Sequence, residues 1–311
     1  MKVLVTCPPM IGLFDEFVEP AKELGIEIVA AKTTQVLSEQ ELIELLPEYD
    51  GWIIGDDPAT RQVFEAGVKG KLKAAVKWGI GVDNVDFSAC KDLGIPITNT
   101  PNMFGGEVAD VAISMLLALT RQTHFIDREI RTNFSWPKPA GMSISNKRVG
   151  IVGFGDIGQS VAKRLMGFDV EVIAYDPGVY GNKGFSYITR SDFPQQLESI
   201  DVLIFTCALN DKNKHMLNKE TIAMLKDGAM VINVARGPLI DESALIDALQ
   251  SGKLKAVGLD VFEVEPLPKN SPLRDMEQCI FGSHNGSNAV EGVQRATYKA
   301  LEHISSFLMD K

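Results

Sequence analysis

The sequence predicts an α/β protein with two doubly wound parallel sheets, and three observations support this fold class. Short apolar runs of strand length alternate along the chain with segments of helical periodicity, as in parallel sheets covered by helices. A glycine-rich turn at residues 153–158 follows one apolar run and opens a helix-forming segment. At 311 residues, the chain exceeds the length that one hydrophobic core usually serves, so two domains are expected.

The first hundred residues are expected to form an α/β unit of their own. Five short apolar runs are predicted as strands, separated by helix-compatible sequence. These runs are residues 3–5, 26–29, 51–54, 74–76 and 97–98. From Pro101 onward, apolar residues such as Val108, Met115 and Leu119 recur at helical spacing, which predicts a long amphipathic helix. We expect this helix to bridge the two domains.

The rest of the chain has the pattern of a second sheet. Residues 133–146 lack periodicity and are expected to form a loop before the glycine turn. Further predicted strands follow at residues 202–206, 229–234, 256–261 and 279–281. The segment 289–308 is helical in period with no strand of its own domain left to cover, so we expect it to return to the first domain. The prediction is a discontinuous domain of residues 1–99 plus 286–311, and a central domain of residues 100–285.

Composition excludes several classes of function. A net charge of −10 and a pI near 5.0 argue against general affinity for nucleic acid or membrane surfaces, which need clustered positive charge. The apolar stretches at the N-terminus and at 111–119 are too short for a signal peptide or a membrane span. The four cysteines have neither CxxC spacing nor a histidine companion. They are Cys7, Cys90, Cys207 and Cys279. We therefore expect a cytoplasmic protein with reduced thiols and no metal.

The glycine turn predicts a Rossmann-like dinucleotide site. Gly153 allows the tight turn, Gly155 lets the backbone approach a phosphate, and Gly158 lets the helix pack on the strand. The first N–H groups of that helix would then face the pyrophosphate. Asp176 ends the next apolar run, where its carboxylate would accept hydrogen bonds from a ribose diol and repel a 2′-phosphate. This favours NAD over NADP; a purely structural turn is the alternative.

Three reactive side chains follow the last predicted strands, at the sheet edge where ligands bind in this fold class. Hydride transfer to a 2-oxo acid needs a cation for the carboxylate and a group that delivers a proton. Arg236 can grip a carboxylate with two parallel hydrogen bonds, and His284 can exchange the proton. Glu265 would hydrogen-bond the second imidazole nitrogen. Each residue alone could be an ordinary surface or loop residue, but their joint position favours catalysis.

The motifs resemble those of the D-isomer-specific 2-hydroxyacid dehydrogenases, and are closest to short phosphoglycerate dehydrogenases. The resemblance covers nearly the whole chain. Its motifs are GIGVDNVD at 79–86, GFGDIG at 153–158, NVARG at 233–237, GLDVFEVEP at 258–266 and HNG at 284–286. It implies a substrate domain built from both chain ends, a central NAD domain, a cleft between them, and a homodimer contacted through the region around the long helix.

The resemblance also implies residue roles. Arg236 looks like the substrate-binding arginine, His284 like the acid/base and Glu265 like its partner. NAD would be contacted by Asp156, Ile157, Cys207, Val234, Asp260 and Gly286, and the substrate carboxylate by backbone N–H groups of Gly79, Ile80 and Gly81. Two local departures leave this set intact: Ser283 stands where the family usually has proline, and residues 206–208 replace a more common His-x-Pro.

The residues around the 79–86 motif predict the substrate. At the position of Lys77, phosphoglycerate dehydrogenases resemble one another in carrying a basic residue near the substrate phosphate. Lys77 also belongs to a run of lysines that is typical of a solvated face. Arg61 is a weaker candidate. The first prediction is therefore oxidation of 3-phosphoglycerate to 3-phosphohydroxypyruvate, with glyoxylate or hydroxypyruvate reduction as the alternative. A non-catalytic NADH-sensing protein is a further alternative, and a malate-type enzyme is disfavoured because its glycine turn lies near the N-terminus.

Overall fold

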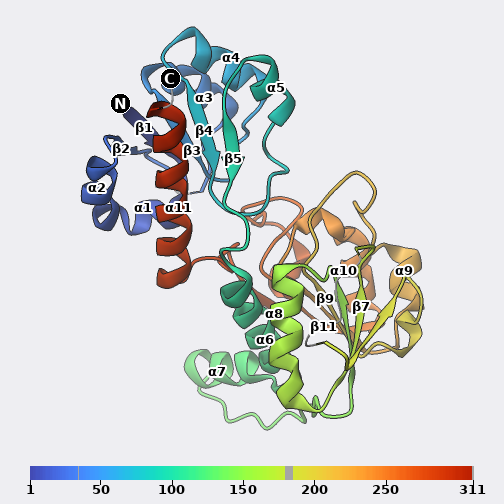
Figure 1. Cartoon of the computed structure of the whole chain (residues 1–311). Helices are drawn as coiled ribbons and strands as arrows, with labels where there is room; N and C mark the ends of the chain where they lie inside the picture. Colours follow the sequence, from blue (N-terminus) through green and yellow to red (C-terminus); the bar gives the residue numbers. More distant parts are fainter. Residues whose placement is uncertain (34, 179–184, 310–311) are drawn as a thin grey trace. The chain divides into compact units, whose positions relative to one another are not determined.

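The computed structural model describes residues 1–33, 35–178 and 185–309, which form two compact units (Figure 1). Unit 1 comprises Met1–Met103 and the segment that begins at Asn288, and unit 2 comprises Phe104–Ser287. The expected divisions at 99/100 and 285/286 differ from these bounds by a few residues. Each unit contains one parallel sheet with helices, so the predicted fold class is confirmed.

Unit 1 is built on a five-stranded parallel sheet in the order β2-β1-β3-β4-β5. Its strands are β1 (Lys2–Val5), β2 (Glu27–Ala30), β3 (Gly51–Ile54), β4 (Ala74–Lys77) and β5 (Ile97–Asn99). The strands coincide closely with the five apolar runs of the sequence. Because every strand is parallel, the carboxyl ends of β3, β4 and β5 lie at one edge. The segments that leave this edge include residues 55–57 and 78–86.

The segments between and after these strands form the helices of unit 1. They are α1 (Pro8–Gly12), α2 (Phe14–Glu23), α3 (Glu39–Leu45), the short 3₁₀ turn η1 (Leu46–Glu48), α4 (Arg61–Lys69), α5 (Phe87–Asp92) and α11 (Val290–Met309). Ser38 and Glu41 form a capping box that starts α3, and Thr60 caps α4. Trp52 of β3 packs in one core cluster with Phe64 of α4. The C-terminal helix α11, red in Figure 1, packs on β3 and β4.

Unit 2 contains a seven-stranded parallel sheet in the order β12-β11-β10-β9-β6-β7-β8. Its strands are β6 (Arg148–Val152), β7 (Glu171–Tyr175), β8 (Ile188–Ser191), β9 (Val202–Phe205), β10 (Ala229–Asn233), β11 (Leu254–Leu259) and β12 (Cys279–Phe281). The chain starts at β6 in the middle and moves outward first to β7 and β8, then from β9 to β12. The order therefore reverses between β6 and β9, which is the switch point where ligands bind in such sheets.

Helices α6 and α8 pack together in unit 2, whereas α9 packs with α10. The helices are α6 (Gly105–Arg121), α7 (Thr123–Thr132), α8 (Asp156–Leu165), α9 (Lys219–Met224) and α10 (Glu242–Gln250), with 3₁₀ turns η2 (Met166–Phe168), η3 (Leu197–Ser199), η4 (Gly237–Leu239) and η5 (Pro272–Asp275). The expectation that the long helix bridges the domains was wrong: α6 lies wholly in unit 2. Its buried residues, Met115 and Leu116 among them, give it an apolar face, and it packs on α8 and β11.

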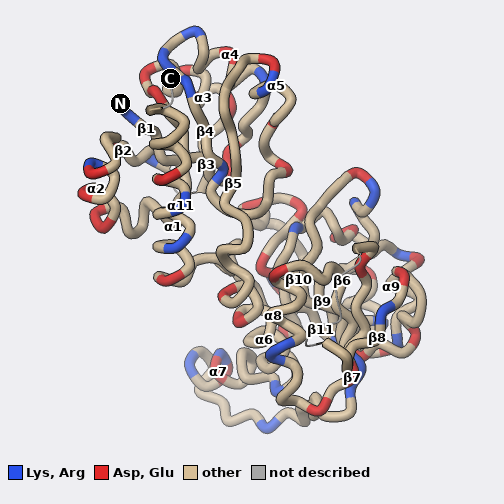
Figure 2. The backbone as a smooth tube through the Cα atoms, in the orientation of Figure 1, with Lys and Arg blue, Asp and Glu red and all other residues tan. Residues whose placement is uncertain are grey.

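Charged residues of both signs are interleaved along both units (Figure 2). Within the ranges given above, no helix combines the length and the apolar character needed to cross a membrane. The four cysteines are free thiols, and burial raises the pKa of Cys7, Cys90 and Cys279 to about 12.

Candidate active site

The glycine turn joins β6 to α8, and its first two glycines meet different requirements: backbone packing at Gly153 and open space at Gly155. Gly153 has a φ of +91°, and a Cβ there would lie 2.6 Å from the backbone of Cys207, so the fold itself requires glycine. The Thr206 hydroxyl donates to the Gly153 carbonyl at 2.7 Å and holds the turn against the end of β9. At Gly155, by contrast, φ is −75° and a Cβ would meet nothing within 4 Å. Open space beside the backbone at this position is what a closely bound phosphate needs.

The residues around this turn fit a bound dinucleotide. Asp156, Ile157 and Gly158 begin α8, so their backbone N–H groups belong to the first turn of a ten-residue helix. The Asp176 carboxylate accepts hydrogen bonds from the N–H groups of Phe154 at 2.5 Å and Gly178 at 2.6 Å. These bonds hold the acid that follows β7 beside the glycine turn, as the ribose contact predicted from the sequence requires.

Two further predicted cofactor residues follow β9 and β10, next to the switch point. Val234 donates its N–H to the Phe205 carbonyl at 3.3 Å, which extends the pairing of these strands to the edge of the sheet. Burial raises the pKa of the Cys207 thiol to about 12, so this side chain is uncharged at neutral pH.

His284 and Glu265 form a hydrogen-bonded pair in unit 2. His284 Nδ1 lies 2.7 Å from Glu265 Oε2, and the two side chains are 21% and 24% exposed. An ionised carboxylate only accepts hydrogen bonds, so it fixes the proton of a neutral imidazole on Nδ1. With the proton on Nδ1, the lone pair of a neutral imidazole is on Nε2, which is the nitrogen that can take up a proton. Glu265 is oriented in turn by the N–H of Phe262, which donates to Oε1 at 2.9 Å.

Asp260 holds the segment that carries His284. It is only 3% exposed, and its carboxylate accepts hydrogen bonds from the N–H groups of Asn285 at 3.1 Å and Gly286 at 2.8 Å. Its backbone carbonyl accepts from the His284 N–H at 2.7 Å. The two predicted cofactor contacts, Asp260 and Gly286, are therefore bonded to each other. This anchoring role was not predicted from the sequence.

Arg236 lies between β10 and η4, in a turn shaped by a buried amide. Asn233, which is 1% exposed, accepts a hydrogen bond from the Ala235 N–H at 3.0 Å and donates to the Arg236 carbonyl at 2.9 Å. A Cβ at Gly237 would overlap the Phe262 backbone at 1.9 Å, so glycine allows this turn to approach the segment that holds Glu265. Sequence analysis missed Asn233; a single amide at the end of an otherwise apolar strand was its signal.

A second histidine–glutamate pair, also missed from the sequence, lies beside the first. His215 Nε2 contacts Glu263 Oε1, and the His215 N–H donates to the Pro238 carbonyl at 2.8 Å. The Glu263 N–H approaches Glu242 Oε2 at 3.4 Å, and burial, reinforced by the charge of Glu263, raises the pKa of Glu242. These contacts connect the segment after β9 with η4 and with the turn after β11.

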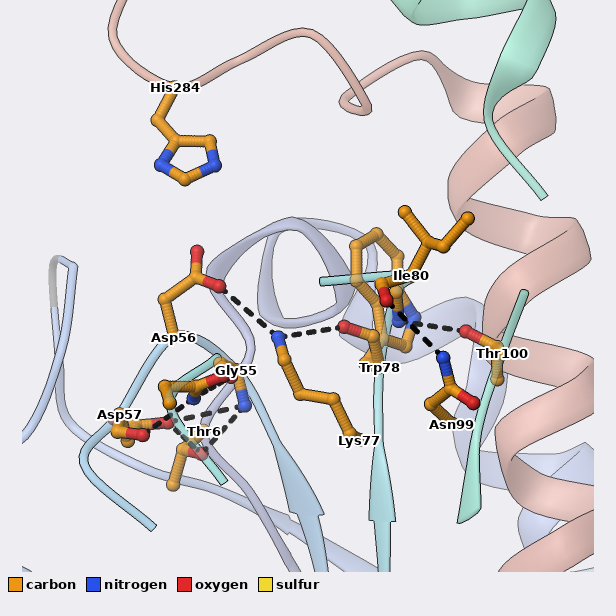
Figure 3. Close-up of polar contacts among 12 residues, drawn as sticks. Thr6, Gly55, Asp56, Asp57, Lys77, Trp78, Ile80, Asn99, Thr100 and His284 are labelled. Carbon is orange, nitrogen blue, oxygen red and sulfur yellow. Dashed lines mark hydrogen bonds and ion pairs between the residues drawn. The ribbon is translucent and has the colours of Figure 1, made fainter. Parts of the chain in front are cut away.

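The predicted substrate segment of unit 1 starts at the end of β4. Lys77 is 3% exposed, and its ammonium donates to Asp56 Oδ1 and to the Trp78 carbonyl, both at 3.1 Å (Figure 3). The Gly79 N–H donates to Thr100 Oγ1 at 2.7 Å, so this amide is committed to the protein. A backbone site for a substrate carboxylate therefore rests on the amides of the next two residues, Ile80 and Gly81.

The first of these amides belongs to an accessible residue. Ile80 is 45% exposed, and its carbonyl accepts from the Asn99 side chain at 3.4 Å. Arg61, the weaker phosphate candidate, instead forms a surface ion pair with Asp92 at 2.6 Å.

Comparison with known proteins identifies relatives along the whole chain. The family described as "D-isomer specific 2-hydroxyacid dehydrogenase, NAD binding domain" matches residues 113–286. The hydroxypyruvate reductase of Thermotoga maritima is 34% identical over 285 residues, covering 88% of this chain and 89% of that protein. The D-3-phosphoglycerate dehydrogenase of Methanocaldococcus jannaschii is 32% identical over 315 residues. That alignment covers 99% of this chain but only 57% of the longer relative.

Solved structures share the same two-sheet architecture. The TT0316 protein of Thermus thermophilus superposes with a TM-score of 0.89 at 29% identity, covering 100% of this chain and 98% of that one. The apo form of D-lactate dehydrogenase from Escherichia coli gives a TM-score of 0.85 at 26% identity, with coverages of 100% and 98%.

Proposed function

This chain belongs to the D-isomer-specific 2-hydroxyacid dehydrogenase family, and we propose that Arg236, Glu265 and His284 carry out its reaction. Its relatives are NAD-dependent dehydrogenases and reductases, and the chain is an enzyme of this class with NAD as its cofactor. The observation that carries the proposal is the 2.7 Å contact between His284 Nδ1 and Glu265 Oε2. This contact gives an oriented imidazole in the unit that holds the glycine turn.

Each residue of the triad has a distinct proposed task. When bound at the 153–158 turn, NAD supplies or accepts the hydride. The Arg236 guanidinium binds the substrate carboxylate and polarises the carbonyl. Neutral His284 accepts the hydroxyl proton on Nε2 during oxidation and returns it during reduction. Glu265 stabilises the imidazolium that forms and keeps the ring in position.

We propose a three-carbon substrate that carries an oxygen at C3. The phosphorylated member, 3-phosphoglycerate with 3-phosphohydroxypyruvate, is favoured by Lys77 and by the 79–86 motif. The unphosphorylated member is favoured by similarity to a hydroxypyruvate reductase, and glyoxylate is its smaller analogue. The amides of Ile80 and Gly81 are proposed to bind the substrate carboxylate in either case.

The test is NADH oxidation by the purified protein. It is measured with 3-phosphohydroxypyruvate, hydroxypyruvate, glyoxylate, pyruvate and oxaloacetate as acceptors. We expect sustained turnover with hydroxypyruvate or 3-phosphohydroxypyruvate and its loss in His284→Ala. NADH binding without turnover of any acceptor would contradict the proposal and indicate an NADH-sensing protein.

We further propose that the enzyme works in the cytoplasm as a homodimer. The four free thiols are compatible with a reducing compartment. Phe134 and Trp136, in the segment after α7, are 91% and 77% exposed, and such large exposed aromatics are typical of association surfaces. Light scattering should give twice the chain mass of 34.0 kDa, and Trp136→Ala should shift the equilibrium toward the monomer. A monomer at micromolar wild-type concentration would contradict the proposal.

A further inference from the structure

The carboxyl edge of the unit 1 sheet holds an asymmetric ion pair. The Lys77 side chain is 3% exposed, whereas that of its partner Asp56 is 41% exposed, with 3.1 Å between Nζ and Oδ1 (Figure 3). The Lys77 ammonium also donates to the Trp78 carbonyl. The cation thus lies buried behind its own counter-ion. A molecule that reaches this edge from solvent meets the carboxylate of Asp56 before the ammonium.

Asp56 is held in this position by its neighbours. The buried Asp57 carboxylate accepts hydrogen bonds from the N–H groups of Leu37 at 2.8 Å and Gly55 at 3.2 Å, and also bonds the Thr6 hydroxyl. The Asn84 amide donates to the carbonyls of Gly55 at 3.1 Å and Asp57 at 2.7 Å. The backbone on both sides of Asp56 is therefore fixed, and it is tied to the same 79–86 segment in which the substrate amides are proposed.

This arrangement opposes a phosphate at Lys77. A phosphate monoester carries nearly two negative charges at neutral pH, and Lys77 can neutralise it only by giving up Asp56. The carboxylate would then lie beside the phosphate, and like charges in such proximity repel each other. A hydroxyl has the opposite relation to Asp56, because it can donate a hydrogen bond to the carboxylate while the Lys77 pair stays intact.

We propose that Asp56 determines the substrate class of this enzyme. By occupying Lys77, it excludes 2-oxo acids with a phosphate at C3 and selects acids whose C3 group is an uncharged hydrogen-bond donor, such as hydroxypyruvate. The inference rests on the proposed function, because it requires that the substrate binds beside the 77–81 segment. It decides between the two three-carbon substrates that the proposed function leaves open.

The experiment compares kcat/KM for hydroxypyruvate and 3-phosphohydroxypyruvate in four proteins. The wild type should prefer hydroxypyruvate by about tenfold or more. Asp56→Asn keeps the size of the side chain and removes its charge, so it should shift the ratio toward the phosphorylated acid by about tenfold or more. Adding Lys77→Met to Asp56→Asn should cancel that gain, because the cation is lost. Asp92→Asn is the matched control: it removes another ion-paired acid of unit 1 and should leave the ratio unchanged.

The outcomes separate the inference from the proposed function. An active wild type that prefers 3-phosphohydroxypyruvate overturns the inference alone, as does an active Asp56→Asn variant with an unchanged ratio. A folded wild type that turns over neither acid overturns the proposed function and the inference with it. If Asp56→Asn does not fold, the wild-type ratio still decides the question.

Discussion

The glutamates of two histidine–glutamate pairs lie two residues apart in unit 2, and we propose that only the His284 pair takes part in proton transfer. His284 pairs with Glu265, and His215 pairs with Glu263, two residues earlier. Both histidines have a positive φ, 56° and 52°. Both backbone N–H groups are anchored, by the Asp260 carbonyl at 2.7 Å and the Pro238 carbonyl at 2.8 Å. By residue type and backbone geometry the pairs are almost equivalent.

The difference lies in the ring nitrogen that each glutamate engages. Glu265 bonds His284 at Nδ1, the nitrogen near the backbone, so the proton-transfer position Nε2 is at the other end of the ring. Glu263 bonds His215 at Nε2, so the outer nitrogen is committed to the protein. We propose that the Nδ1 pairing orients His284 as a base, whereas the Nε2 pairing of His215 joins two segments of the chain. Residue type alone therefore does not identify a catalytic histidine.

Replacement of the two histidines gives the largest expected contrast. His284→Ala should lower kcat by about 10²–10⁴-fold, because general acid–base catalysis is lost, while the Kd for NADH changes little. His215→Ala should leave kcat within about threefold, because the His215 pair takes no part in proton transfer. Steady-state kinetics and NADH titration check both variants. Equal losses of kcat would show that the assignment of roles is wrong.

Replacement of the two glutamates tests the same difference between the pairs. Glu265→Gln keeps an acceptor for Nδ1 but removes the charge that stabilises the imidazolium, so kcat should fall by about 10–10²-fold, as expected for about 1.5–3 kcal/mol of charged hydrogen bonding. Glu263→Gln should have little effect on kcat. The measurement is kcat at saturating NADH over a range of pH. A larger loss in Glu263→Gln than in Glu265→Gln would reverse the roles of the pairs.

Arg236 precedes η4, whose Pro238 carbonyl accepts the His215 N–H, so variants of both residues test which of them substrate binding requires. Arg236→Lys keeps the charge and loses the forked geometry, so kcat/KM should fall by about tenfold or more, mainly through KM. His215→Ala should leave KM nearly unchanged. If the two variants raise KM equally, substrate binding depends on the His215 pair rather than on the guanidinium.

His215→Ala should have the smallest effect on catalysis but a measurable effect on stability. His215→Ala removes the side-chain partner of the Glu263 carboxylate, so we expect about 0.5–1.5 kcal/mol less free energy of unfolding for this partly exposed pair. Denaturant titration at neutral pH measures it, with Glu263→Gln as the companion variant. Unchanged stability together with reduced kcat would mean that His215 acts in the reaction.

The sequence predicted the features that depend on local pattern. Apolar runs indicated the strands, and the ends of parallel strands brought Arg236, Glu265 and His284 into one unit, where Glu265 contacts His284 as expected. The glycine turn was recognisable because Gly153 and Gly155 follow a strand and precede a helix.

Features that depend on loop conformation could not be predicted. Asp56 and Lys77 lie on neighbouring strand ends, and nothing in their spacing shows that one covers the other. The anchoring by Asp260 bonds backbone N–H groups, which leave no pattern of residue types, whereas Asn233 was recognisable only as a single amide at the end of an apolar strand. The Gly79 N–H was expected to face the substrate, but the fold uses it for Thr100.

The most direct test of the account is a double-mutant cycle on kcat, with the acceptor that the wild type reduces fastest. It compares His284→Ala, Glu265→Gln and the double variant, and in parallel His215→Ala, Glu263→Gln and their double variant. We predict that Glu265→Gln has no further effect on kcat once His284 is absent, because the glutamate acts only through that imidazole. The parallel cycle should show no coupling in kcat. A full, independent loss from Glu265→Gln in the absence of His284 would contradict the assignment of these two residues as one catalytic unit.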